Sequence, residues 1–300
     1  MRGSYLEFSS GRISGSTAVY ALIGDPVDHS LSPIIQNVAF RSAGIDAVYV
    51  ALHVTRRSLR DAIKGLRASS VKGFNVTAPH KVAVQLHLDM IEPSADAIGS
   101  VNTVINENGK LRGYNTDGVG ALRALEEAGE SPDGKSVLIF GAGGASRAIA
   151  YTLAHHASSI RLVNRTLANS KQLALRIRRK LHIDVEYASM SNRMLKDFVE
   201  QANIVINASS MGMEGVSIPP VAAEWLRHDQ CVFDIVYKPL HTGLLEIASL
   251  AGAKSLNGLD MLVNQGACAF ELWTERRAPI IEMRRAIDQN VLAMEHAKSS

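Results

Sequence analysis

The sequence predicts an α/β protein made of two domains. Short runs rich in β-branched residues alternate with longer helical patterns over nearly all of the 300 residues. This alternation is typical of βα units that feed a mostly parallel sheet. A single hydrophobic core rarely grows much beyond about 250 residues, so the length favours two cores. We therefore expect two domains with a cleft between them.

The first domain is expected to open with βα units. Its predicted strands are Val19–Ile23, Val48–Leu52 and Gly73–Thr77, each followed by a helical pattern. The first helix should open at Pro33, because proline suits the first turn of a helix. Two further strands, Asn102–Asn106 and Lys110–Tyr114, flank a glycine-containing turn and predict a hairpin.

The second domain is expected after a helix at about Thr116–Ala128 and a polar break at Ser131–Gly134. Its predicted strands are Ser136–Phe140, Ile160–Val163, Val185–Tyr187, Ile204–Asn207, Val232–Val236 and Lys254–Leu256. Two helices with no strand between them should close the chain, at about Asp260–Thr274 and Pro279–Lys298.

The charge pattern argues against a nucleic-acid partner. The 32 basic and 29 acidic residues give a formal net charge of +3 and are spread along the chain, whereas nucleic-acid binders concentrate basic residues on one surface. The densest basic run, Arg176–Lys180, falls near the predicted end of a helix. Cations are favoured there by the helix dipole, and we expect water to solvate them.

Cysteine use and hydropathy indicate a cytoplasmic protein. Cys231 and Cys268 have no paired spacing and no neighbouring histidine pattern, so we expect buried, reduced thiols and no metal site. The amino terminus lacks the apolar core of a signal peptide, and no apolar run reaches the roughly 18 residues of a membrane span. We therefore expect no membrane partner.

A glycine-rich turn follows the strand predicted at 136–140. In VLIFGAGGASRAIAYTLA, Gly141 and Gly143 stand between an apolar strand and a helix, which is the context of a dinucleotide-binding turn. Gly141 permits the tight turn, Gly143 lets the backbone approach a pyrophosphate, and the helix beyond supplies amide donors. Ser146 is small enough to pack at the third position. The alternative is a turn that needs glycine for a positive φ and binds nothing.

The residues after the next strand favour NADP. About twenty residues beyond the turn, NAD-binding domains carry an acidic side chain for the ribose hydroxyls. This chain instead has Asn164, Arg165 and Thr166, with no Asp or Glu between Ile160 and Asp184. An arginine suits a 2′-phosphate through its charge. The alternative is that Arg165 is a surface residue without a ligand.

Polar residues gather where two predicted strands end. Lys81 closes the segment Asn75–Lys81, and Asp117 closes the segment Gly113–Asp117. The carboxyl ends of parallel strands are where α/β proteins form their sites, and a lysine beside a carboxylate there can transfer protons. The alternative is a salt bridge at a domain seam.

Nine motifs in order make the chain resemble a shikimate dehydrogenase over nearly its whole length. They are GDPVDHSLSP at 24–33, NVTAPHK at 75–81, GSVNT at 99–103, YNTDGVG at 114–120, GAGGASRA at 141–148, VNRT at 163–166, INASSMGM at 206–213, DIVYKPLHTGLL at 234–245 and NGLDMLVNQGACAFELWT at 257–274. The resemblance implies NADP-dependent, reversible reduction of 3-dehydroshikimate to shikimate in aromatic amino-acid biosynthesis.

The resemblance also implies a role for each matching residue. Lys81 and Asp117 would be the catalytic pair. The substrate would be held by Ser30 and Ser32 at its carboxylate, by Thr77, Asn102 and Gln265 at its ring hydroxyls, and by Tyr237 nearby. The cofactor would contact Gly141, Gly143, Ala145, Asn164, Arg165, Thr166, Met213 and Gly258. The substrate domain would be discontinuous, with residues 1–117 and 259–300, and the dinucleotide-binding domain would span 118–258.

Five positions depart from the family's usual pattern. Gln36 stands where a histidine is common, and Ser100 replaces a small apolar residue. Asn169 stands where NADP-preferring members often carry a second arginine, which weakens the prediction of strict NADP preference. Ser209 replaces a threonine and Gly243 a proline in predicted turns.

Two other functions stay open on the sequence. A quinate or aminoshikimate dehydrogenase would use the same fold and the same lysine–aspartate pair. A dinucleotide-sensing module without turnover would need neither Lys81 nor Asp117, and the chain retains both. We expect a monomer or a homodimer whose partners are small molecules.

Overall fold

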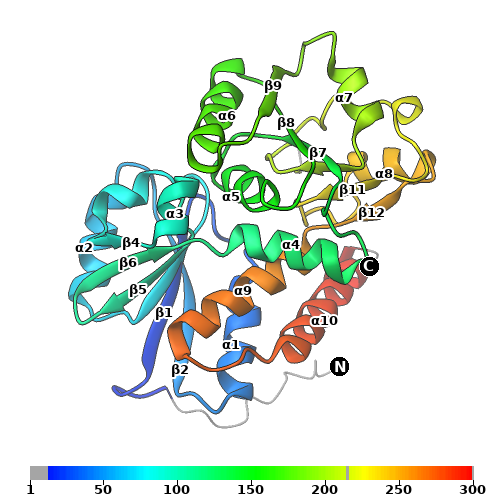
Figure 1. Cartoon of the computed structure of the whole chain (residues 1–300). Coiled ribbons are helices and arrows are strands. Elements are labelled where there is room, and N and C mark those ends of the chain that lie inside the picture. The colour runs from blue at the N-terminus through cyan, green and yellow to red at the C-terminus, as the bar shows by residue number, and fades with distance from the viewer. Residues whose placement is uncertain (1–12, 214–215, 299–300) are drawn as a thin grey trace.

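The computed structural model describes residues 13–213 and 216–298. Two six-stranded sheets organise these residues, one from each half of the strand-forming sequence. Figure 1 shows the two sheets in separate halves of the molecule, with helix α4 (Asp117–Glu127) running along the boundary between them. The prediction of an α/β protein with two mostly parallel sheets is confirmed.

The first sheet is mixed. Its order is β2 (Ala47–His53), β1 (Ala18–Gly24), β3 (Gly73–Val76), β5 (Thr103–Glu107), β6 (Lys110–Tyr114) and β4 (Met90–Ile91). The β1 strand pairs in parallel with β2 and β3, whereas β5 is antiparallel to both β3 and β6. The predicted hairpin is therefore confirmed.

This topology brings three polar segments to one edge of the first sheet. The β3 and β6 strands both run opposite to β5, so their carboxyl ends lie at the edge where β5 begins. The register pairs Asn75 with Thr103, and Thr103 with Tyr114. The residues after β3, before β5 and after β6 consequently meet at the same edge.

The second sheet is parallel throughout. Its order is β12 (Lys254–Leu256), β11 (Cys231–Asp234), β10 (Ile204–Asn207), β7 (Ser136–Phe140), β8 (Ser159–Asn164) and β9 (Val185–Ser189). When β7 is counted as the first strand and the sheet is read from β9 to β12, this is the 3-2-1-4-5-6 order of a doubly wound dinucleotide-binding sheet. One face is packed by α5 (Gly144–Leu153) and α6 (Leu167–Leu181), and the other by α7 (Leu195–Gln201) and α8 (Gly243–Leu250).

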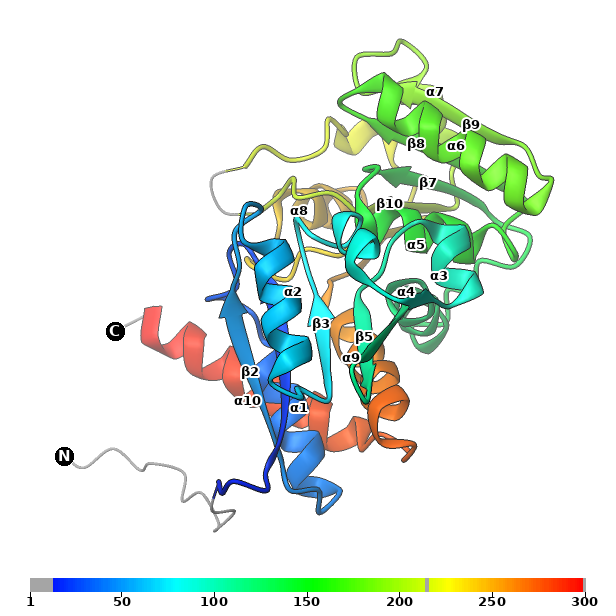
Figure 2. The same cartoon turned by 90° about the vertical axis from the view of Figure 1, so that its left-hand side faces the viewer.

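The last two helices return to the first sheet. Helices α9 (Leu259–Thr274) and α10 (Ile280–Lys298) pack beside α1 (Ser32–Ser42), as Figure 2 shows for α1 and α10. Phe270 and Met283 are fully buried in one core with Phe40. Helix α2 (Leu59–Ala68) covers the opposite face. This packing supports the predicted discontinuous substrate domain, whose boundaries stay a prediction.

Several local features differ from the sequence predictions. The short strand β4 and helix α3 (Pro93–Ile98) were not expected, and the segment after β3 leads into a 3₁₀ helix (Ala83–His87) instead of an α-helix. The strand predicted at 232–236 ends at Asp234. Each difference involves a short element, for which hydrophobic periodicity carries little signal.

The basic run lies in the last turns of α6, as predicted, and Arg179 and Lys180 are exposed, but two of its side chains also contact α3. Arg176 Nε donates to the carbonyl oxygen of Ala97 at 2.8 Å, and Lys180 Nζ lies 3.2 Å from Asp96 Oδ2. These side chains attach α6 to the carboxyl end of α3, where the helix dipole favours cations.

Within residues 13–213 and 216–298, no helix is long and apolar enough to cross a membrane.

Candidate active site

A lysine–aspartate ion pair lies at the edge of the first sheet. Lys81 follows β3 and Asp117 opens α4, and their Nζ and Oδ2 atoms are 2.6 Å apart. The Lys81 side chain is 16% exposed and that of Asp117 is 4% exposed. The lysine therefore keeps limited access to water, whereas the carboxylate is almost fully enclosed.

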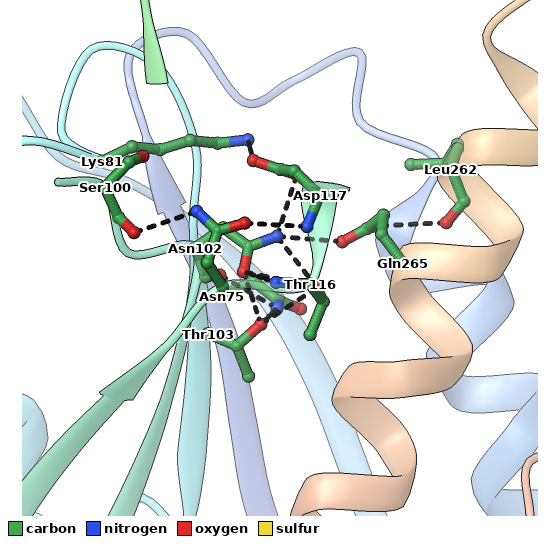
Figure 3. A network of polar contacts seen from close by, with 10 residues as sticks. Asn75, Lys81, Ser100, Asn102, Thr103, Thr116, Asp117, Leu262 and Gln265 are labelled. Atoms are coloured by element: carbon green, nitrogen blue, oxygen red, sulfur yellow. Dashed lines mark hydrogen bonds and ion pairs between the residues drawn. The ribbon is translucent and has the colours of Figure 1, made fainter. Parts of the chain in front are cut away.

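Asn102 connects this pair to the rest of the site, as Figure 3 shows. Its Nδ2 donates to Asp117 Oδ1 at 2.8 Å and to Thr116 Oγ1 at 2.9 Å. Its Oδ1 accepts from the backbone amide of Thr116 at 2.8 Å and from Thr103 Oγ1 at 3.0 Å. Gln265 reaches the same amide from α9, with Oε1 3.5 Å from Asn102 Nδ2. One buried amide thus fixes the carboxylate and faces the predicted ring-hydroxyl ligand Gln265.

A second layer of polar residues, for which the sequence predicted no individual roles, supports Asn102 and Asp117. Asn75 Nδ2 donates to Thr103 Oγ1 at 3.0 Å, and Tyr49 donates its hydroxyl to Asn75 Oδ1 at 2.7 Å. Burial raises the pKa of the Tyr49 phenol well above its ordinary value, so it remains a donor. Asn115 Oδ1 accepts from the backbone amide of Asp117 at 3.0 Å, and its Nδ2 donates to the Ser100 carbonyl at 2.9 Å. The detectable signal was the density of polar residues at buried strand ends.

The predicted carboxylate ligands lie near Tyr237. Ser30 and Ser32 stand at the start of α1, where the Ser30 hydroxyl accepts from the Ser32 backbone amide at 3.2 Å. Burial raises the pKa of the Tyr237 phenol, while hydrogen bonding to the Ser30 side chain and the Leu31 backbone acts in the opposite direction. Thr77 is half-buried at the end of β3, against Gly24. The structure therefore brings Tyr237, from the second half of the chain, to the serines of the first.

The glycine-rich turn has the shape that a dinucleotide requires. Gly141 has a φ of +115°, and a methyl group there would lie 2.8 Å from the Ala208 carbonyl oxygen. Gly143 is exposed, and a methyl group on it would meet nothing within 4 Å. No side chain caps the amino end of α5, while Ser146 Oγ donates to the Gly141 carbonyl at 2.7 Å. Open space beside uncapped helix amides fits a pyrophosphate.

The other predicted cofactor residues are dispersed around this turn. Arg165 and Thr166 are exposed after β8, and Asn164 Nδ2 donates to the Thr166 carbonyl at 3.0 Å. Ala145 lies in the first turn of α5, and Met213 is 46% exposed in the loop after β10. Gly258, at the start of α9, is buried against the Ile235 backbone, so its predicted cofactor contact stays a prediction.

Within the described residues, no cluster of three or more His, Cys, Asp or Glu is placed to hold a metal ion.

A buried carboxylate organises the loops that carry Met213 and Tyr237. Asp234 Oδ1 accepts from Asn207 Nδ2 at 2.9 Å, and Oδ2 accepts from Thr242 Oγ1 at 2.7 Å. Burial raises the pKa of Asp234, although these hydrogen bonds act to lower it. The network joins the segments after β10 and β11, and β10 pairs with β7, the strand that leads into the glycine-rich turn.

The fold and this geometry define a class of protein. A doubly wound sheet with a glycine-rich turn binds dinucleotides, and here the turn adjoins an enclosed lysine–carboxylate pair. The protein is a dinucleotide-dependent oxidoreductase.

Comparisons with known proteins give the family. The models for the shikimate dehydrogenase substrate binding domain, shikimate / quinate 5-dehydrogenase and the shikimate 5'-dehydrogenase C-terminal domain match residues 22–104, 123–225 and 258–287. The shikimate dehydrogenase (NADP(+)) of Moorella thermoacetica is 44% identical over 279 residues, which cover 92% of this chain and 94% of that protein. The chain belongs to the shikimate dehydrogenase family, and the resemblance found in the sequence is confirmed.

Solved structures agree with this assignment. A shikimate dehydrogenase crystallised in complex with NADP⁺ superposes with a TM-score of 0.86 at 42% identity, covering 93% of this chain and 97% of that one. The Listeria monocytogenes shikimate 5-dehydrogenase, solved with shikimate and NAD, gives a TM-score of 0.84 at 39% identity, covering 93% and 99%.

The raised pKa of Asp234 predicts a pH-dependent stability term. Between its ordinary pKa of 3.8 and its higher folded value, the folded protein binds more protons than the unfolded chain. The stability contributed by this group therefore falls as pH rises through that window. In urea unfolding, the Asp234→Asn variant should gain stability relative to the unmodified protein from about pH 4 upward. Thr242→Val, which removes a hydrogen bond that lowers the pKa, should steepen the decline; a difference independent of pH for both variants contradicts this.

Proposed function

We propose that this protein catalyses the NADP-dependent, reversible reduction of 3-dehydroshikimate to shikimate in aromatic amino-acid biosynthesis. The observation that carries the proposal is the enclosed pair of Lys81 and Asp117, 2.6 Å apart and connected through Asn102 to Gln265. The family membership and the shikimate-bound relative support the same substrate.

The residues around the glycine-rich turn fit NADP. The uncapped amino end of α5 and the exposed Gly143 offer amides to a pyrophosphate, and Arg165 offers a cation to a 2′-phosphate. Met213 would lie along the nicotinamide. When bound, NADPH supplies the hydride for the carbonyl carbon of the substrate.

Lys81 supplies the proton. As hydride reaches the carbonyl carbon, negative charge develops on the carbonyl oxygen, and the Lys81 ammonium can donate a proton to it. Donation of this proton to the substrate makes the Lys81 amine neutral, next to the Asp117 carboxylate. Because the lysine side chain is 16% exposed, water can restore its proton. Asp117 orients Nζ, and Asn102 holds Asp117 through its other oxygen.

The remaining residues hold the substrate. We assign the carboxylate to Ser30 and Ser32, with Tyr237 beside them, and the ring hydroxyls to Thr77, Asn102 and Gln265. The substrate domain would comprise residues 1–117 and 259–300, and the dinucleotide-binding domain residues 118–258. Packing of α9 and α10 beside α1 supports this division.

We also propose that the enzyme acts in the cytoplasm, as a monomer or homodimer with small-molecule partners. The two cysteines are free thiols, Cys231 buried and Cys268 half-buried. Burial raises the pKa of Cys231 to about 12, so this thiol stays protonated and unreactive.

The alternatives differ from this proposal in substrate or in turnover. Quinate carries an extra hydroxyl on the carbon that bears the carboxylate, so the space near Ser30, Ser32 and Tyr237 decides between the two acids. A dinucleotide sensor would not consume NADPH.

The direct test is oxidation of NADPH by the purified protein with 3-dehydroshikimate. We expect turnover that Lys81→Ala lowers by about 10²- to 10⁴-fold, since it removes the proton donor, while NADPH binding by fluorescence titration changes little. Quinate oxidation with NADP⁺ and the reaction with amino-substituted rings are assayed in parallel. Faster turnover of either favours that relative, and no turnover by the folded protein favours the sensor.

Arg165 should determine the preference for NADPH over NADH. Charge-assisted hydrogen bonds contribute about 1.5–3 kcal/mol, so Arg165→Ala should raise the KM for NADPH by about 10- to 100-fold and leave that for NADH nearly unchanged. Arg60→Ala, at an exposed position on α2 over the first sheet, is the matched control. Equal effects of Arg165→Ala on both cofactors would show that Arg165 does not recognise the 2′-phosphate.

A further inference from the structure

Gly144 lies between the dinucleotide turn and the catalytic lysine. It follows Gly143 and is the first residue of α5. A methyl group on Gly144 would lie 2.7 Å from Lys81 Cβ, 3.0 Å from Lys81 Cδ and 2.9 Å from Ser100 Oγ. The backbone of the turn therefore touches the stem of Lys81 directly.

Glycine is required here for a different reason from that at its neighbours. Non-bonded carbon atoms prefer separations of about 3.5–4.0 Å, so a side chain on Gly144 cannot be accommodated without movement. Gly141 needs its positive φ of +115°, whereas a methyl group on Gly143 would meet nothing within 4 Å. Gly144 has neither of these features, and its close contacts are with residues of the catalytic edge.

The neighbours of Gly144 cannot easily give way. The contact is with Cβ, at the base of the lysine side chain, so a rotamer change at its far end does not relieve it. The Lys81 backbone is held by the Val101 amide, which donates to its carbonyl at 2.8 Å. Ser100 is fully buried, and Asn115 donates to its carbonyl. A larger residue at 144 must displace either the lysine stem or the turn.

We propose that Gly144 is a positioning residue for catalysis: by its lack of a side chain it seats the dinucleotide turn on the stem of Lys81 and sets the place of Nζ between Asp117 and the substrate. The proposal rests on the proposed role of Lys81. Under this proposal, two adjacent glycines of one turn have different roles: Gly143 allows the cofactor to bind, and Gly144 allows Lys81 to transfer its proton.

The two glycines can be separated by matched substitutions. Gly144→Ala should lower kcat by about 10- to 100-fold, because displacement by about 1 Å can cost that much in rate, and it should leave the dissociation constant of NADPH within about threefold of the unmodified protein. Gly143→Ala should instead weaken NADPH binding, raising the dissociation constant of NADPH by about tenfold. Gly65→Ala, in the open space on α2, controls for glycine replacement.

Steady-state kinetics with 3-dehydroshikimate and fluorescence titration of NADPH provide the readouts. A Gly144→Ala protein that keeps kcat within twofold, or that loses only NADPH affinity, overturns the proposal. Should this variant not fold by circular dichroism, Gly144→Ala combined with Ser100→Ala, which removes one of the three contacts, takes its place under the same criteria.

Crystal structures keep this test separate from the test of function. If the unmodified protein does not turn over 3-dehydroshikimate, the proposed function fails, but the positioning can still be measured. A Lys81 Nζ to Asp117 Oδ2 distance that lengthens from 2.6 Å in Gly144→Ala supports the proposal. An unchanged distance overturns it.

Discussion

The proposed active site depends on the ion pair between Lys81 and Asp117. Removing two charges from water costs several kcal/mol per ion, and their attraction offsets this only where the remaining hydrogen-bonding capacity is met. Here Asn102 donates to the second carboxylate oxygen, and Asn115 accepts from the Asp117 amide. The polar network around the pair is therefore a condition for its existence. It also explains why buried asparagine and threonine side chains concentrate at one sheet edge.

That edge exists because of the mixed topology of the first sheet. A fully parallel sheet would place the start of β5 at the opposite edge from the ends of β3 and β6. The antiparallel insertion of β5 brings Asn102 beside the Lys81–Asp117 pair, where it donates to Asp117. The second sheet then presents its glycine-rich turn to the same place, with Gly144 against the stem of Lys81. In the proposed reaction, the residues that bind the hydride donor would thus come from the second sheet and the proton donor from the first.

Much of the fold and part of the candidate site could be predicted from the sequence. Alternation of apolar and turn residues located the principal strands, and the ordered motifs identified the family. The sequence also predicted that Lys81 and Asp117 lie together. Contacts between distant segments could not be predicted. Examples are the contact of Arg176 with α3, the joining of two loops by Asp234, and the hydrogen bond from Tyr49 to Asn75. Each depends on which segments the fold brings together, and neither local propensity nor spacing encodes that. The short α3 and β4 were missed because a single turn or a two-residue pair carries no periodicity.

The central claim is that Lys81 and Asp117 act as one catalytic unit. A double-mutant cycle on kcat/KM, with Lys81→Ala, Asp117→Ala and the double variant, tests it most directly. Residues that act as a unit are strongly non-additive, so the double variant should lose little more activity than the more impaired single variant. If the two losses instead multiply, the residues contribute independently, and the account of a single proton-transferring pair is contradicted.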